Sequence, residues 1–168
     1  GEKKGRVSSW DLNRNALKIA NGNGDWDSVL AHLQKMTIND KNPECYKARA
    51  QAAWLALKIQ VPGAVVTDVL FKLLISLGPN HGSRGALASL ANLMAIHRQP
   101  EHVDQPLARS HAQQMMLHAC TLPPEERTPE GIERWLEENH LNEPEIFVPQ
   151  VMDFLLEMSG DDWWFNDE

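Results

Sequence analysis

The chain has 168 residues, of which 42% are hydrophobic and 23% charged, and its net charge is −7. This length allows one domain with its own core, and this hydrophobic content argues against a disordered chain. The longest apolar patch, residues 65–77, is interrupted by Asp68 and Lys72. It does not match a membrane span, which needs about 18 or more consecutive apolar residues, so we expect no insertion into a membrane.

The first residues and the two cysteines indicate the cellular compartment in which the protein is expected. Residues 1–8 are polar, lack the apolar centre of a signal peptide, and are expected to form a flexible lead. Cys45 and Cys120 lie far apart, outside any Cys-x-x-Cys or Cys/His spacing. The sequence therefore favours a protein with reduced cysteines in the cytoplasm.

The first half of the chain shows helical signals in three places. Ser8 is suited to cap a helix that stops at Gly22, and Asp25 is suited to cap the next one. Asn42 and Pro43 are expected to open a third helix that continues through Gln60. The expected apolar stripe of the second helix is Trp26, Val29, Leu30, Leu33 and Met36, and that of the third is Tyr46, Ala50, Ala53, Trp54 and Leu57.

Helical signals continue through the second half. A fourth helix is expected after the break at Val61-Pro62-Gly63, and Gly78-Pro79 ends it. Its apolar stripe is Val66, Val69, Leu70, Leu73, Leu74 and Leu77. Ser83 starts the next helix, whose small residues allow another helix to approach closely. Further helices are expected from Pro106 to about Cys120 and from Thr128-Pro129 onwards. A last helix is expected over residues 151–158, after the irregular stretch NEPEIFVPQ, and Ser159-Gly160 closes it.

These signals predict an all-α fold of about eight helices in stacked antiparallel hairpins, at residues 9–36, 43–77, 83–120 and 128–158. Pairs that recur every 35–45 residues are typical of helical-repeat arrays, although a compact orthogonal bundle leaves the same pattern. Both arrangements stay open. The expected organisation is one helical domain over residues 9–158, followed by an acidic aromatic tail over residues 159–168.

One segment carries a family resemblance. The stretch NALKIANGNGDWDSVLAHLQKM, residues 15–36, reads as a helix, a Gly-Asp turn and a second helix that ends in Met36. Over these 22 residues it resembles a hairpin of the tetratricopeptide or pentatricopeptide type. The resemblance implies a scaffold that binds peptides or RNA. The segment is one residue short of the usual pentatricopeptide register, and the tetratricopeptide signature does not recur, so no base-reading residues are carried over.

Residues with catalytic or metal-binding chemistry do not fall into recognisable patterns. His111 and His118 lie two turns apart on one helix face, roughly 10 Å along the axis, too far to chelate one ion unaided. The chain has no Gly-x-Ser-x-Gly elbow, so we expect no enzyme, no metal and no cofactor. The glycine-rich turn GPNHGSRGA, from Gly78 to Ala86, is suited either to hold an anion beside His81 and Arg84 or simply to restart a helix.

The charge is unevenly distributed along the chain. Residues 1–121 contain 14 Lys/Arg and 9 Asp/Glu, whereas residues 122–168 contain 2 and 14. A basic body opens the alternative of an RNA- or DNA-binding scaffold in which the acidic end acts as an autoinhibitor. The bases are scattered, however, and the sequence pI is about 5.5, whereas nucleic-acid binding normally needs a concentrated basic surface. The competing interpretation is a solvated acidic helix face plus a tail.

The end of the chain, GDDWWFNDE, combines acids with large aromatic rings. Its candidate partner-binding residues are Trp163, Trp164 and Phe165 for contact, with Asp161 and Asp162 for electrostatic steering. One interpretation is that these rings dock into another protein or a second copy of the chain, whose surface would be basic and pocketed. The other is that they fold back onto their own domain. Replacing Trp163 and Trp164 by alanine would then lower the melting temperature, whereas docking predicts weaker association at unchanged stability.

The sequence as a whole favours a non-enzymatic helical adaptor for protein–protein interaction, with the acidic aromatic C-terminus as its docking segment. Its partner would be another protein or a second copy of the chain. Nucleic acid is the alternative partner.

Overall fold

The protein is all-helical over the part of the chain that the structure, a computed structural model, describes: residues 8–39 and 41–166. This confirms the fold class expected from the sequence. The helices are α1 (Ser9–Gly22), α2 (Trp26–Met36), α3 (Cys45–Lys58), α4 (Gly63–Ser76), α5 (Arg84–His97), α6 (Gln105–Ala119), α7 (Pro129–Glu138) and α8 (Pro144–Ser159), with a short 3-10 turn, η1 (Pro124–Glu126).

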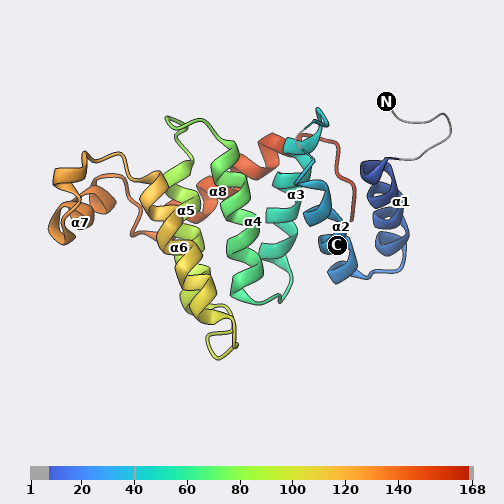
Figure 1. The fold of residues 1–168 in the computed structure, drawn as a ribbon, viewed down its shortest axis with the longest axis horizontal. Coiled ribbons are helices and arrows are strands. Elements are labelled where there is room, and N and C mark those ends of the chain that lie inside the picture. The colour runs from blue at the N-terminus through green and yellow to red at the C-terminus, as the bar shows by residue number, and fades with distance from the viewer. Residues whose placement is uncertain (1–7, 40, 167–168) are drawn as a thin grey trace.

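Helices α1 to α5 stand side by side in chain order, and α6 lies against both α4 and α5; each helix is antiparallel to the one before it (Figure 1). Each helix packs on the next, and α6 also packs on α4. Helix α8 runs across this row and contacts α3 and α5. One large core results, to which α4 contributes leucines, α3 and α5 contribute series of alanines, and α1, α2, α6 and α8 contribute further apolar side chains.

Small side chains let these helices approach one another closely. In α3, Ala48, Ala50, Ala52, Ala53 and Ala56 are all fully buried, and α5 buries Ala86, Ala88, Ala91 and Ala95 in the same way. Alanine has the highest helix propensity and a very small side chain, so it favours both the helix and the close contact. Tyr46 does not belong to this buried face as expected from the sequence, because its ring is 45% exposed.

Several helix starts follow the predicted capping chemistry. The side chain of Ser8 accepts a hydrogen bond from the Asp11 N–H, and that of Asp25 accepts one from the Ser28 N–H. The start of α3 differs from the expectation: Asn42 does not cap it, and the helix begins at Cys45. The Asn42 amide oxygen instead accepts a hydrogen bond from the Glu44 N–H, which forms a local turn ahead of the helix.

Two arginines hold helix ends in place. The Arg98 guanidinium, just after α5, donates to the carbonyl oxygens of Ala56, Leu57, Ile59 and Val61 at the end of α3. Arg127 does the same for the end of α6, with bonds to the carbonyls of Leu117, Cys120 and Leu122. Carbonyls at helix C-termini lack partners within their own helix, so each arginine satisfies groups that the helices leave open.

The last two helices differ from the expected hairpin over residues 128–158. Helix α7 projects from one end of the row, while α8 runs back toward α3 (Figure 1). Helix α8 also begins at Pro144, seven residues earlier than expected, and includes Pro149. Pro144 occupies the first turn, where no N–H is needed, and Pro149 costs the helix only the bond to the exposed Glu145.

Two further expectations bear on chemistry and location. Cys45 and Cys120 are buried thiols, and no disulfide joins them. Among the described residues, no helix combines the length and the hydrophobicity that crossing a membrane requires.

Candidate interaction site

The C-terminal segment, defined as residues 160–166, does not extend into solvent. It leaves α8 at Gly160 and passes over the top of α3, then descends beside α2 toward α1 (Figure 1). There it covers one surface of the first three helices. We call this surface the aromatic face; it consists of Trp10, Arg14 and Asn21 of α1, Trp26 of α2, and Lys47, Gln51 and Trp54 of α3.

The Gln51 side-chain amide forms two hydrogen bonds with the main chain of the segment. Its Nε2 donates to the carbonyl oxygen of Asp162 at 2.7 Å, and its Oε1 accepts from the Trp164 N–H at 3.1 Å. The Gln51 side chain is completely buried. A buried amide must find partners for both its donor and its acceptor, and here the backbone of Asp162 and Trp164 provides them.

A second main-chain contact lies further along the segment. The Asn166 N–H donates to the Asn21 Oδ1 at 3.0 Å. The aromatic face therefore binds the backbone of the segment at two places, as a peptide-binding surface does.

The aromatic rings of the segment each meet a ring of the body. Trp164 packs edge-to-face on Trp10, with centroids 5.7 Å apart, and the Arg14 guanidinium lies 4.7 Å from the Trp164 ring centroid. Trp163 meets Trp54 and Phe165 meets Trp26. Five of the six tryptophans in the chain thus gather at this site. Such contacts favour binding beyond the area that they bury.

Charge complements this packing. The Lys47 Nζ lies 2.9 Å from the Asp162 Oδ2, and this hydrogen bond lowers the pKa of Asp162 and raises that of Lys47. Burial lowers the pKa of Arg14, against the opposing effects of Asp162 and Glu44. One acid of the C-terminal segment, Asp162, therefore lies beside two bases of the body, Lys47 and Arg14.

The Lys47–Asp162 pair predicts a pH window for attachment of the segment. Because the folded pKa of Asp162 is depressed, its contribution is complete above the ordinary aspartate pKa of about 3.9 and is lost as the pH falls through the folded value. The folded pKa of Lys47 is raised, so the pair stays intact up to the ordinary lysine pKa of about 10.4. It is lost as the pH rises through the pKa of Lys47 in the folded protein.

Acid titration of tryptophan fluorescence would measure this window. We expect Asp162→Asn to weaken attachment at neutral pH and to remove part of the acid-induced change. Asp161→Asn is the matched control, because Asp161 is exposed, and it should behave as the unmodified chain. Equal effects of the two substitutions would contradict the role given to the pair.

The structure brings together four of the five residues that the sequence singles out. Trp164 and Phe165 are each only 6% exposed, Trp163 is partly buried, and Asp162 is in the ion pair. Asp161 remains exposed. This is the fold-back arrangement that the sequence left open.

Sequence reasoning missed the residues on the receiving side. The apolar pattern places Trp26 and Trp54 in core stripes, and it gives no role to Gln51. Gln51 is a single amide side chain within the run Arg49-Ala-Gln-Ala-Ala-Trp54, on a helix face of small residues. This isolated polar position is the signal that could have identified Gln51 as a binding residue. A polar side chain among buried alanines must have a partner.

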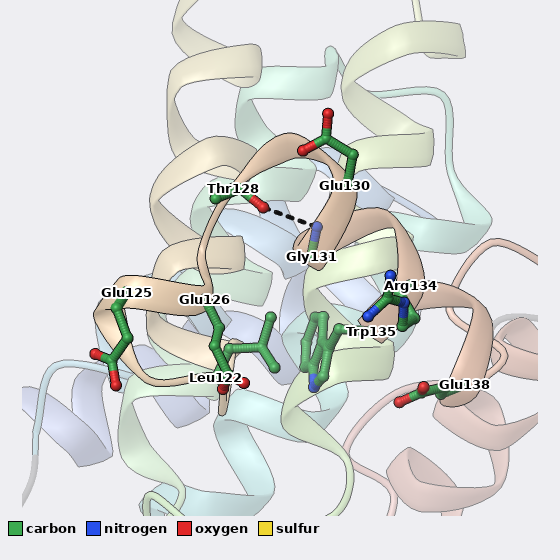
Figure 2. A pocket seen from close by; sticks show the side chains of 9 residues that line it. All are labelled: Leu122, Glu125, Glu126, Thr128, Glu130, Gly131, Arg134, Trp135 and Glu138. Atoms are coloured by element: carbon green, nitrogen blue, oxygen red, sulfur yellow. Dashed lines mark hydrogen bonds between the residues drawn. The ribbon is translucent and has the colours of Figure 1, made fainter.

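The molecule also has hollows away from this site, and one lies between η1 and α7 (Figure 2). It has a volume of about 360 Å³ and is lined by Trp135, Arg134 and the carboxylates of Glu125, Glu126, Glu130 and Glu138. All four glutamates are exposed. A Cβ at Gly131 would overlap the carbonyl oxygen of Glu126, so glycine is what lets this turn pack on the helix.

The glycine-rich turn lies beside a second hollow, of about 360 Å³. The His81 Nδ1 accepts a hydrogen bond from the Ser83 N–H, and the Arg84 Nη1 donates to the Pro79 carbonyl. Both side chains thus support the turn itself, as expected of a helix restart.

The histidines do not assemble into a metal site. His111 and His118 both pack against Phe71, and the His111 Nδ1 lies 3.0 Å from the Thr67 hydroxyl. Within residues 8–39 and 41–166 no group of three or more His, Cys, Asp or Glu side chains is placed to hold a metal ion.

Comparison of the chain with protein-family models, with curated proteins and with solved structures gave no match. The function must therefore be argued from the site itself.

Proposed function

We propose that the protein is a non-enzymatic helical adaptor whose aromatic face binds acidic, tryptophan-rich peptide segments. Its own C-terminal segment is the one bound in the structure. The observation that carries this proposal is the double hydrogen bond between the buried Gln51 amide and the backbone of Asp162 and Trp164. Side chains that pair with backbone recognise a peptide in a defined register, and ring contacts on either side then select its sequence.

The chemistry of the preferred peptide follows from the contacts. An acid is needed opposite Lys47, and two residues later a large ring is needed between Trp10 and Arg14. A further ring then meets Trp26. Tryptophan and arginine are the residues that dominate binding energy at protein interfaces, and both occur at the centre of this site.

The experiment uses the full chain with Trp164→Ala, which weakens the segment but leaves the aromatic face intact. A synthetic peptide with the sequence of residues 159–168 is added, and binding is followed by the melting temperature. We expect the peptide to bind and stabilise the variant, by about 2.7 kcal/mol when its concentration is 100 times its dissociation constant.

Two controls make the result specific. A peptide in which Trp164 is replaced by alanine should not stabilise the variant. A chain that carries Gln51→Leu together with Trp164→Ala should not respond to either peptide, because the backbone hydrogen bonds are lost. If the unmodified peptide fails to stabilise the Trp164→Ala chain, the proposed function is wrong.

A further inference from the structure

We infer that a second copy of this chain is a partner of the aromatic face, and that two copies exchange their C-terminal segments reciprocally. This inference rests on the proposed function, because it requires the face to bind the segment in trans. In the exchanged dimer, each aromatic face makes the same contacts as in the monomer, but with residues 160–166 of the other copy.

The contacts of the segment make it a separable unit. Its side-chain-mediated hydrogen bonds go to α1 and α3, through Asn21, Lys47 and Gln51, and its rings meet those of α1, α2 and α3. From Asp162 onwards, its bond to α8 is from the Asp162 N–H to the Ser159 carbonyl oxygen. Helix α8 is held independently by α3 and α5. Releasing the segment therefore leaves the packing of α8 unchanged.

The turn at Gly160 supplies the hinge. Its φ of 58° and ψ of −134° direct the chain back onto its own body, and only glycine adopts this conformation readily. The turn is held by a hydrogen bond from the Asp162 N–H to the Ser159 carbonyl oxygen at 3.3 Å and by one from the Trp163 Nε1 to the Gly160 carbonyl oxygen at 3.1 Å. Opening the hinge must break the first of these bonds. Glycine adopts an extended conformation just as well, and an extended Gly160 would direct the segment away from its own body.

The shortness of the hinge fixes the geometry of the dimer. Gly160 and Asp161 are the two residues between the end of α8 and Asp162, which Gln51 and Lys47 hold. The three extended steps from Ser159 to Asp162 span at most about 11 Å. The ends of the two α8 helices, and with them the two copies of Asp161, must therefore lie close together in the exchanged dimer.

The balance between the two forms depends on concentration. Exchange keeps the contacts of the segment with the aromatic face and loses the turn hydrogen bond from the Asp162 N–H to the Ser159 carbonyl oxygen. The monomer is otherwise favoured by the effective concentration of a tethered segment, which is about millimolar for short linkers. We expect dimer at comparable protein concentrations, or after refolding of a concentrated denatured sample.

Complementation between two full-length variants tests the exchange. A Gln51→Leu chain keeps an unmodified C-terminal segment but has a weakened aromatic face. A Trp164→Ala chain keeps an unmodified aromatic face but has a weakened segment. In a mixture, the first chain can place its segment on the second without competition in cis. We expect at least about tenfold more dimer in the mixture than in either variant alone at the same total concentration, measured by light scattering.

A second measurement uses the otherwise unmodified chain with Asp161→Cys. Asp161 is exposed, and Cys45 and Cys120 are buried, so the new thiol is the accessible one among the described residues. Oxidation of a concentrated refolded sample should join two copies through this position. The additional replacement Trp164→Ala should abolish that cross-link, because it removes the ring contact that holds the exchanged segment.

The outcomes separate the two proposals. If the free peptide stabilises the Trp164→Ala chain but neither complementation nor cross-linking occurs, exchange is wrong and the peptide-binding function stands. If the peptide does not bind, the function itself is wrong. A dimer that forms equally in the mixture and in each variant alone would show an interface other than the exchanged segment, and would also overturn the inference.

Discussion

Replacement of Trp164 by alanine is expected to lower the melting temperature by roughly 10 °C, since loss of a buried tryptophan costs about 3–5 kcal/mol and each kcal/mol corresponds to about 2–4 °C in a chain of this size. The ring is 6% exposed and packs on Trp10 under the Arg14 guanidinium. Its removal leaves a cavity between the segment and the aromatic face.

The loss has an upper bound, because the segment can detach while the helices stay folded. Once it is detached, further substitutions in it have no contacts left to remove. We therefore expect a Trp163→Ala, Trp164→Ala, Phe165→Ala chain to melt within a few degrees of the Trp164→Ala chain, rather than at the sum of three separate losses. Thermal unfolding followed by far-UV circular dichroism measures this.

Leu117→Ala provides the comparison for this experiment. Leu117 is 59% exposed on α6, and such surface substitutions usually change stability by less than about 0.5 kcal/mol. An unchanged melting temperature for Trp164→Ala, together with weaker association, would instead support the interpretation that these rings serve only another molecule.

Local chemistry explains which parts of the fold the sequence predicts. Ser8 and Asp25 cap helices because each has a polar side chain at the right distance before an apolar stripe, and the contacts that result span three residues. The proline-containing stretch before residue 151 misled the same reasoning. Pro149 removes the helix hydrogen bond to the carbonyl of Glu145, an exposed residue. The packing of Phe147 and Val151 in the core outweighs the loss of that bond.

The candidate site shows the limit of such reasoning. Composition indicates that Trp163, Trp164 and Phe165 need a surface, but not which one. The partner of Trp164 is Gln51, 113 residues earlier in the chain. Nothing in the sequence around Gln51 names that partner. The pairing depends on α8 crossing α5 and α3 and ending near the start of α3, a consequence of the whole fold.

Arg98→Leu is expected to lower the free energy of unfolding by about 3 kcal/mol. Hydrogen bonds to charged groups contribute about 1.5–3 kcal/mol each, and in the variant water can replace only some of these bonds. The Arg98 guanidinium donates to four carbonyl oxygens, at 2.8–3.2 Å, where α3 ends and the chain turns into α4. Burial lowers the pKa of Arg98, because the guanidinium is partly removed from water. Leucine would leave all four of them without this donor.

Two comparisons make this prediction specific. Arg98→Lys keeps the charge but not the fork of two donating nitrogens, so it should recover part of the loss. Arg109→Leu removes an exposed arginine from α6 and should leave stability nearly unchanged. Urea unfolding measures all three. Gln51 and Trp54 belong to α3, so fraying at the end of that helix should also loosen the C-terminal segment. This can be tested in chains that carry Trp164→Ala. There, the chain with Arg98→Leu should bind the free peptide more weakly than the chain with Arg98→Lys. Equal binding by the two chains would show that the end of α3 and the aromatic face are independent.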